Sequence, residues 1–179
     1  MAARYHFLSE YKFRGNPERI WAALVDVEAW PSWWSWLKRI ETLRAATGDD
    51  GVRAVYRNTV RAPAGYGLTY DTRVTDVDHR RRIDVESRGD LRGRGRFYVH
   101  ERPDGTTDVS FAWLVDTPKR WMSFLAPIAR PAFSWNHDHM MTAFGTGLAT
   151  TAGAQLLSTK NTTIAPGSPE FQVMPEPEV

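Results

Sequence analysis

Polar and apolar residues alternate through the middle of the chain, from about residue 37 to residue 116. In one stretch Tyr66, Leu68 and Tyr70 occupy every second position, and Thr69 lies among the residues between them. Successive side chains of a β-strand point to opposite faces. This period therefore predicts strands with one face buried against the core and the other exposed to solvent. Half-buried strands of this kind are typical of an antiparallel meander.

Signals for a strand and two short helices precede this region. Residues 4–13 are rich in Tyr and Phe and predict a first strand. Asn16 and Pro17 then provide a helix cap and a favourable first helical residue. Four tryptophans within residues 30–36 surround a proline and predict a second short helix or a structured turn. This tryptophan cluster forms either a membrane-surface patch or a plug that closes one end of the core.

A helical period returns after Thr117 and runs to about residue 151. Pro127 and Pro131 each remove a backbone hydrogen bond, so we expect this long helix to bend or break there. Its second part carries one apolar stripe with a single histidine in it, formed by Phe133, His137, Met140, Phe144 and Leu148.

Composition limits the class of protein. The chain has 179 residues, a net charge of +2 and no cysteine, which excludes disulfide scaffolds, thiol nucleophiles and Cys-ligated zinc. It contains no apolar segment of membrane-spanning length and no signal sequence, so we expect a soluble, cytoplasmic protein without stable membrane insertion. We divide it into one domain at residues 1–151 and a Pro/Ser/Thr-rich tail at residues 152–179 that is disordered or extended and has no core residues.

Two hairpin registers follow from the requirement that paired residues share a face. A three-residue loop at residues 89–91 places Glu86 opposite Arg94 and Asp84 opposite Arg96, which gives two favourable charge pairs. A three-residue loop at residues 103–105 sets Phe97 opposite Phe111, Val99 opposite Val109 and Gly95 opposite Trp113.

Five segments carry a family resemblance, namely residues 17–21, 28–33, 89–95, 117–121 and 134–138. In their order and spacing they resemble the START-like, or Bet v 1-like, superfamily (SRPBCC), and in particular its bacterial polyketide cyclase/dehydrase and lipid transport branch. The resemblance implies an α+β helix-grip fold. In that fold two short helices follow the first strand, and a curved antiparallel sheet of about six to seven strands wraps around the long C-terminal helix, with a deep cavity between sheet and helix.

The predicted lining of such a cavity consists of the strand residues that the alternation turns inward, together with the apolar stripe of the long helix. Gly93 and Gly95 share this inward parity and leave space beside them because they have no side chain. The alternative is that the aromatic residues simply fill the core. The predicted ligand-binding residues are Tyr56, Asn58, Tyr66, Leu68, Tyr70, Phe97, Phe111, Trp113, Phe133, Asn136, His137, Met140 and Phe144.

Three of these residues are candidates for proton transfer. His137 could hydrogen-bond a ligand carbonyl or move a proton near neutral pH, or it is a core histidine that a neighbouring group satisfies. The phenols of Tyr56 and Tyr70 could orient or protonate a substrate, or they cap the rim with hydroxyls in water. The amide of Asn58 needs a partner, which is a ligand, a water molecule or the neighbouring backbone.

Other chemistries find little support in the sequence. His137 and His139 are two residues apart and point in different directions on a helix, so we predict no metal site, and no motif calls for a cofactor. Arginines at alternating strand positions form a solvated outer face that acidic residues partly neutralise, so we predict no nucleic-acid partner.

Three functions remain open. The preferred one is binding of a hydrophobic small molecule, such as a lipid, sterol, quinone or polyketide-like compound. The second is an enzyme of the polyketide cyclase or aromatase type that uses the same cavity. The third is a protein-interaction domain of the co-chaperone kind, which a filled core without a cavity would favour. The sequence does not specify the ligand or the oligomeric state.

Overall fold

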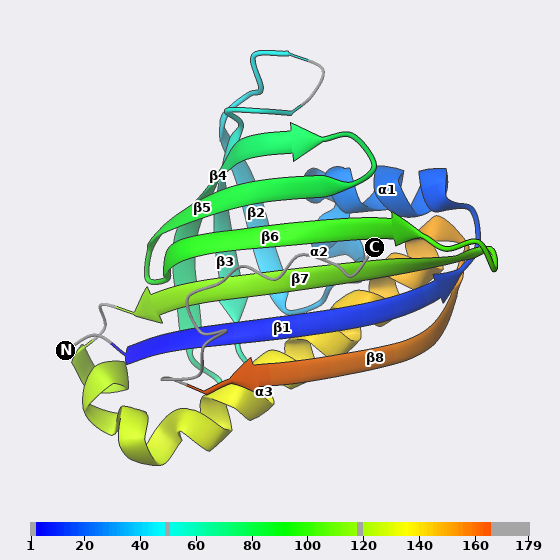
Figure 1. The fold of residues 1–179 in the computed structure, drawn as a ribbon. Helices are drawn as coiled ribbons and strands as arrows, with labels where there is room; N and C mark the ends of the chain where they lie inside the picture. The colour runs from blue at the N-terminus through cyan, green and yellow to red at the C-terminus, as the bar shows by residue number, and fades with distance from the viewer. Residues whose placement is uncertain (1–2, 49–50, 118–119, 166–179) are drawn as a thin grey trace.

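The structure, a computed structural model, describes residues 3–48, 51–117 and 120–165, with side chains for residues 4–48, 51–117 and 131–165. Strands form most of it, and a single long helix follows the seventh strand (Figure 1). The elements are β1 (Ala3–Arg14), α1 (Pro17–Val25), the 3₁₀ helix η1 (Val27–Ala29), α2 (Trp30–Trp33), β2 (Leu37–Arg44), β3 (Val55–Arg61), β4 (Gly67–Asp78), β5 (Arg82–Gly89), β6 (Arg92–Glu101), β7 (Thr106–Thr117), α3 (Arg120–Ala152) and β8 (Gln155–Ile164).

The strands form one curved antiparallel sheet in the order β2-β3-β4-β5-β6-β7-β1-β8. The predicted α+β helix-grip architecture is confirmed, with two short helices after the first strand and α3 running along the sheet. The expectation of six to seven strands is wrong, because the described part of the sheet has eight. Pro127 and Pro131 lie inside α3, and the first part of this helix turns away from the rest (Figure 1).

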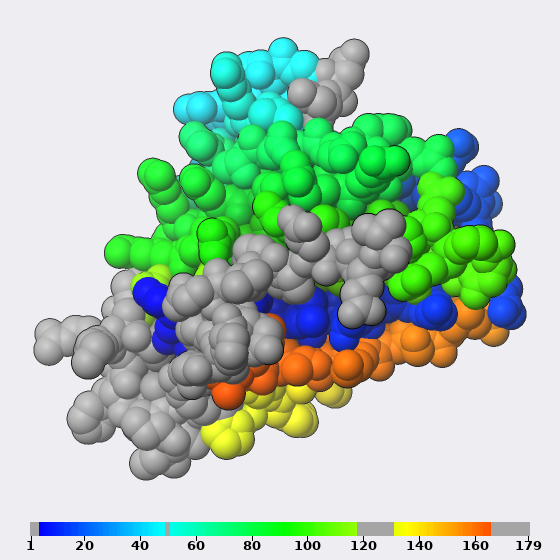
Figure 2. Space-filling view, viewed as in Figure 1, coloured from blue at the N-terminus to red at the C-terminus, as the bar shows by residue number. Residues whose placement is uncertain are grey.

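The additional strand is β8, which corrects the expectation of a disordered or extended tail after residue 151. Residues 155–164 pair with β1, and Figure 2 shows the two strands side by side. The edge of β1 offers unpaired backbone groups, and the chain reaches it directly after α3 through Gly153 at φ 64. Leu156 also packs against the core, so the domain extends beyond residue 151. Residues 166–179 lie outside the described residues.

Both predicted hairpin registers are confirmed. Glu86 pairs with Arg94, and Asp84 pairs with Arg96, whose Nη2 donates to Asp84 Oδ2 at 3.0 Å. In the next hairpin Phe97 lies opposite Phe111, Val99 opposite Val109 and Gly95 opposite Trp113; the rings of the first pair stack at 4.2 Å. The alternation of inward and outward side chains was sufficient to predict both registers, because a shift of the pairing by one residue would turn every covered side chain outward.

Close contacts hold α3 against the N-terminal elements. The buried hydroxyl of Tyr11 on β1 donates to Met141 O at 2.9 Å, and Trp34 Nε1 donates to Met140 O at 2.8 Å. Gly147 lies directly against Trp33 of α2, where an added Cβ would come within 2.8 Å of the Trp33 carbonyl oxygen. The helix can approach this closely because glycine has no side chain at the contact.

Candidate functional site

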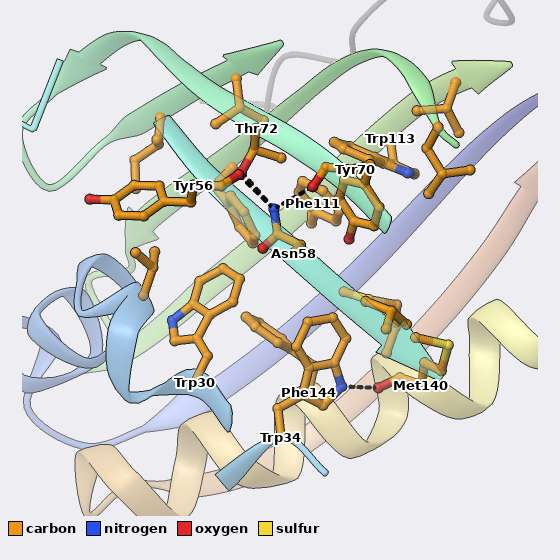
Figure 3. A pocket seen from close by; sticks show the side chains of 18 of the residues that line it. Trp30, Trp34, Tyr56, Asn58, Tyr70, Thr72, Phe111, Trp113, Met140 and Phe144 are labelled. Atoms are coloured by element: carbon orange, nitrogen blue, oxygen red, sulfur yellow. Dashed lines mark hydrogen bonds between the residues drawn. The ribbon is translucent and has the colours of Figure 1, made fainter. Parts of the chain in front are cut away.

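A cavity of about 860 Å³ lies between the concave face of the sheet and the helices α1 and α3 (Figure 3). Aromatic and aliphatic side chains form most of its wall. The alternative that the aromatic residues fill the core completely is therefore wrong for this region. All thirteen predicted ligand-binding residues line this single cavity: Tyr56, Asn58, Tyr66, Leu68, Tyr70, Phe97, Phe111, Trp113, Phe133, Asn136, His137, Met140 and Phe144.

Asn58, a buried residue of β3, is the amide in the sheet wall. Its Nδ2 donates to Thr72 Oγ1 at 2.9 Å and lies 3.2 Å from Tyr56 O and 3.4 Å from Tyr70 O. Of the three partners that the sequence left open, the structure thus supplies neighbouring protein groups for Nδ2. Figure 3 shows the Asn58 Oδ1 on the opposite side of the amide, facing the cavity.

The tyrosines differ in their surroundings. Tyr70 is deeply buried, and burial raises the pKa of its phenol to about 12, so the hydroxyl keeps its proton at neutral pH. Burial also raises the pKa of Tyr66 to about 12, with a further contribution from Tyr5 and an opposing one from Asn136. Tyr56 is less buried, and its hydroxyl points away from Asn58 and Tyr70 in Figure 3. Tyr56 thus fits the rim better than the interior.

His137 lies in the wall formed by α3, with its ring stacked on Phe7 at a centroid distance of 4.0 Å. Neither of its ring nitrogens has a hydrogen-bond partner among the described residues, and Asp138 Oδ1 is 3.7 Å from Nδ1. Burial lowers the pKa of the imidazole, and the neighbouring Asp138 opposes this shift. The ring is therefore neutral at pH 7 and has an acceptor nitrogen that no described protein group uses.

Asn136 connects α3 to the loop between β3 and β4. Its Oδ1 accepts a hydrogen bond from Ala64 N at 2.9 Å, and its side chain is 2% exposed. Because this oxygen is bound to the backbone, Asn136 positions the loop over the cavity.

Sequence reasoning missed the contribution of the N-terminal elements. Tyr5 and Phe7 of β1 and Trp21 of α1 line the cavity. Trp30 also lines it, and its ring lies 5.2 Å from that of Phe144, as expected for a plug at one end of the core. Tyr5 and Phe7 are two residues apart and so face the same side of β1, which the sequence could have shown. This alternation alone does not distinguish a cavity wall from a packed core.

The two inward glycines do not act as expected. An added Cβ at Gly95 would lie 2.4 Å from Trp113 Cε3, and one at Gly93 would lie 2.0 Å from Leu114 O. The space beside these glycines is occupied, so they do not enlarge the cavity. Gly95 instead makes room for the Trp113 indole to pack closely against the backbone of the sheet.

Charged side chains occupy the outer face of the sheet. Arg57 Nε contacts Asp71 Oδ1 at 2.8 Å, and Arg73 Nη2 lies 3.7 Å from Glu86 Oε2. These pairs match the predicted solvated face. None of the described helices is long and apolar enough to cross a membrane.

Comparisons with known proteins agree with this architecture. The Zhui aromatase/cyclase from Streptomyces sp. R1128 is similar over 84% of this chain and 94% of its own, with 16% identity and a TM-score of 0.63. A START superfamily protein from Mycobacterium smegmatis is similar over 81% and 98%, with 19% identity and a TM-score of 0.59. Norcoclaurine synthase from Thalictrum flavum, as a point mutant with a transition-state analogue, is similar over 85% and 96%, with 13% identity and a TM-score of 0.57.

At these identities the solved structures establish the shared fold. A comparison with curated proteins finds no significant match. The sequence model of one family, described as "Polyketide cyclase / dehydrase and lipid transport", matches residues 15–144, which include every strand from β2 to β7 and most of α3. The chain belongs to this polyketide cyclase/dehydrase and lipid transport family.

Proposed function

We propose that this protein binds a hydrophobic small molecule in the cavity between the sheet and α3. The observation that supports this most directly is the size and chemistry of the cavity, about 860 Å³ within walls of aromatic and aliphatic side chains. Small-molecule sites typically have volumes of roughly 300–1,000 Å³ with a few polar groups that fix orientation. A protein-interaction domain with a filled core fits this hollow interior less well.

Native mass spectrometry of the purified protein, together with titration of the neutral dye Nile red, tests this function. We expect a co-purifying apolar molecule or, after its removal by organic extraction and refolding, saturable Nile red binding with a blue-shifted emission. The blue shift follows because the dye leaves water for an apolar cavity. Absence of both a bound molecule and dye binding would contradict the proposal.

A cyclase or aromatase activity is the second candidate, and His137 is the residue that favours it. A neutral imidazole with an unused nitrogen in an apolar wall can accept a proton from a substrate carbon or hydroxyl. Tyr70, which keeps its proton, can donate a hydrogen bond to a carbonyl oxygen of the substrate. The cavity would hold a flexible poly-ketone in a reactive conformation.

For this activity we expect His137→Gln to lower turnover of a linear poly-β-ketone by about 100-fold or more, which is the usual contribution of a general base. Binding of the same compound should change little. Because burial lowers the pKa of His137, wild-type turnover should fall on acidification with a midpoint below the ordinary histidine value of about 6.5, where the imidazole becomes protonated. Equal turnover by wild type and variant, measured by chromatography of the products, would exclude His137 as the base.

A further inference from the structure

Acidic and strongly basic side chains are absent from the described part of the cavity wall. Among the lining residues that the structure describes, none is Asp, Glu, Lys or Arg, and the two histidines are His79 and His137. Burial lowers the pKa of His137, so this ring does not supply a cation at pH 7 either. An ionised carboxylate or ammonium group transferred from water into such a wall would lose its hydration without gaining an ion pair.

One hydrogen-bond acceptor in this wall has a fixed direction. Two of the groups around Asn58 Nδ2 are carbonyl oxygens, which only accept hydrogen bonds, so the nitrogen of the amide must face them. The hydroxyl of Thr72 accepts from the same nitrogen and lies 3.4 Å from Tyr56 O, to which it donates. Thr72 is therefore a positioning residue, and Asn58 Oδ1 is directed into the cavity as an acceptor (Figure 3).

A hydrogen-bond donor stands beside this acceptor. Tyr70 is paired with Asn58 in the register of β3 and β4, and both side chains project from the same face of the sheet. Its hydroxyl has no hydrogen-bond partner among the described residues and faces the cavity in Figure 3. The phenol remains protonated at neutral pH, so it offers an O–H group to a ligand oxygen.

Flat aromatic rings extend from this polar pair. The Tyr70 ring lies 6.1 Å from that of Trp113, which lies 5.3 Å from that of Phe111, and Phe111 stacks on Phe97 at 4.2 Å. The ring planes are tilted by 52° at the first of these contacts, by 33° at the second and by 21° at the third, so ring edges as well as faces line this side of the cavity. A planar aromatic ligand can pack on such rings through offset-stacked and edge-to-face contacts.

Building on the proposed function, we propose that the cavity selects uncharged, planar, ring-containing ligands that carry a hydroxyl group, and that it rejects carboxylates of the same shape. The ligand hydroxyl donates to Asn58 Oδ1 and accepts from the Tyr70 hydroxyl. The ring system lies along the aromatic row, which ends at Phe97.

Three fluorescent probes of matched shape test this selection, with energy transfer from the protein tryptophans as the signal. At pH 7.0 we expect 1-hydroxypyrene to bind about tenfold more tightly than 1-methylpyrene, and 1-pyrenecarboxylate to bind more weakly than both. A factor of about ten is what one good hydrogen bond contributes. Tyr70→Phe and Asn58→Leu should each remove most of the preference for 1-hydroxypyrene over 1-methylpyrene.

Tyr98→Phe is the matched control, because Tyr98 lies outside the cavity lining and its hydroxyl accepts from Arg96 Nη1 at 3.2 Å. This variant should bind all three probes as the wild type does. If Asn58→Leu does not fold, Tyr70→Phe decides the outcome by itself. Equal affinities for the three probes, or tightest binding of the carboxylate, would overturn the selection rule and leave the cavity as the binding site. Failure of all three probes to bind would contradict the proposed function itself.

Discussion

We expect the double variant Val74→Trp/Val85→Trp to bind Nile red at least about 20-fold more weakly than the wild type, because it fills the cavity. Val74 and Val85 are cross-strand partners in the middle of the sheet, and both line the cavity. Two indoles at these positions would occupy the volume that a ligand needs. Because they enter empty space rather than a packed core, the variant should remain folded.

The opposite face of the same strands offers a matched control. Arg73 and Glu86 are also cross-strand partners, but they face water and form an exposed ion pair. Arg73→Trp/Glu86→Trp therefore introduces the same two indoles next to the first pair in sequence and outside the cavity. Fluorescence titration should give wild-type affinity for this control. Wild-type affinity of the cavity-facing variant would instead show that the dye binds elsewhere.

The second large effect concerns stability. In an exposed helix, Gly→Ala stabilises by up to about 1 kcal/mol, because alanine has the higher helix propensity. Gly147→Ala should have the opposite sign, with a loss of about 2–3 kcal/mol, because its Cβ would lie 2.6 Å from Trp33 Cε3 and 2.8 Å from the Trp33 carbonyl oxygen. For a domain of this length the loss corresponds to a decrease in Tm of roughly 5–10 °C in a thermal unfolding experiment.

Thr146→Ala controls for the substitution itself, because Thr146 is exposed on the same turn of α3 and its hydroxyl donates only to Thr142 O at 3.2 Å. It should change the Tm by little. A Gly147→Ala variant as stable as the wild type would mean that α3 does not pack against α2 as closely as the structure shows.

The sequence predicted the architecture well where side-chain parity carries the information. In β5, β6 and β7 every covered residue must stay on one face, so charge pairs such as Asp84 with Arg96 and ring pairs such as Phe97 with Phe111 determined the register. The same parity identified eight residues of the cavity wall, and the helical period of α3 identified Phe133, His137, Met140 and Phe144.

Other features depend on contacts that pattern alone does not reveal. The segment of β8 is rich in Ser and Thr, which occur in loops as well as strands, and it becomes a strand because β1 offers it a free edge. Gly95 has the inward parity of a residue that leaves space, yet the ring of Trp113 fills that space. Whether aromatic side chains fill a core or surround a cavity depends on the distance between sheet and helix. The spacing of apolar residues along the sequence does not determine that distance.

The position of β1 between β7 and β8 has a consequence for how the protein is made. Its two neighbours come from segments that are roughly 100 and 150 residues further along the chain. Such long-range pairing slows folding, because distant parts of the chain must meet before the gain in free energy is realised. During synthesis on the ribosome, both edges of the first strand therefore stay unpaired until β7 has emerged, and the second edge stays unpaired until β8 has followed.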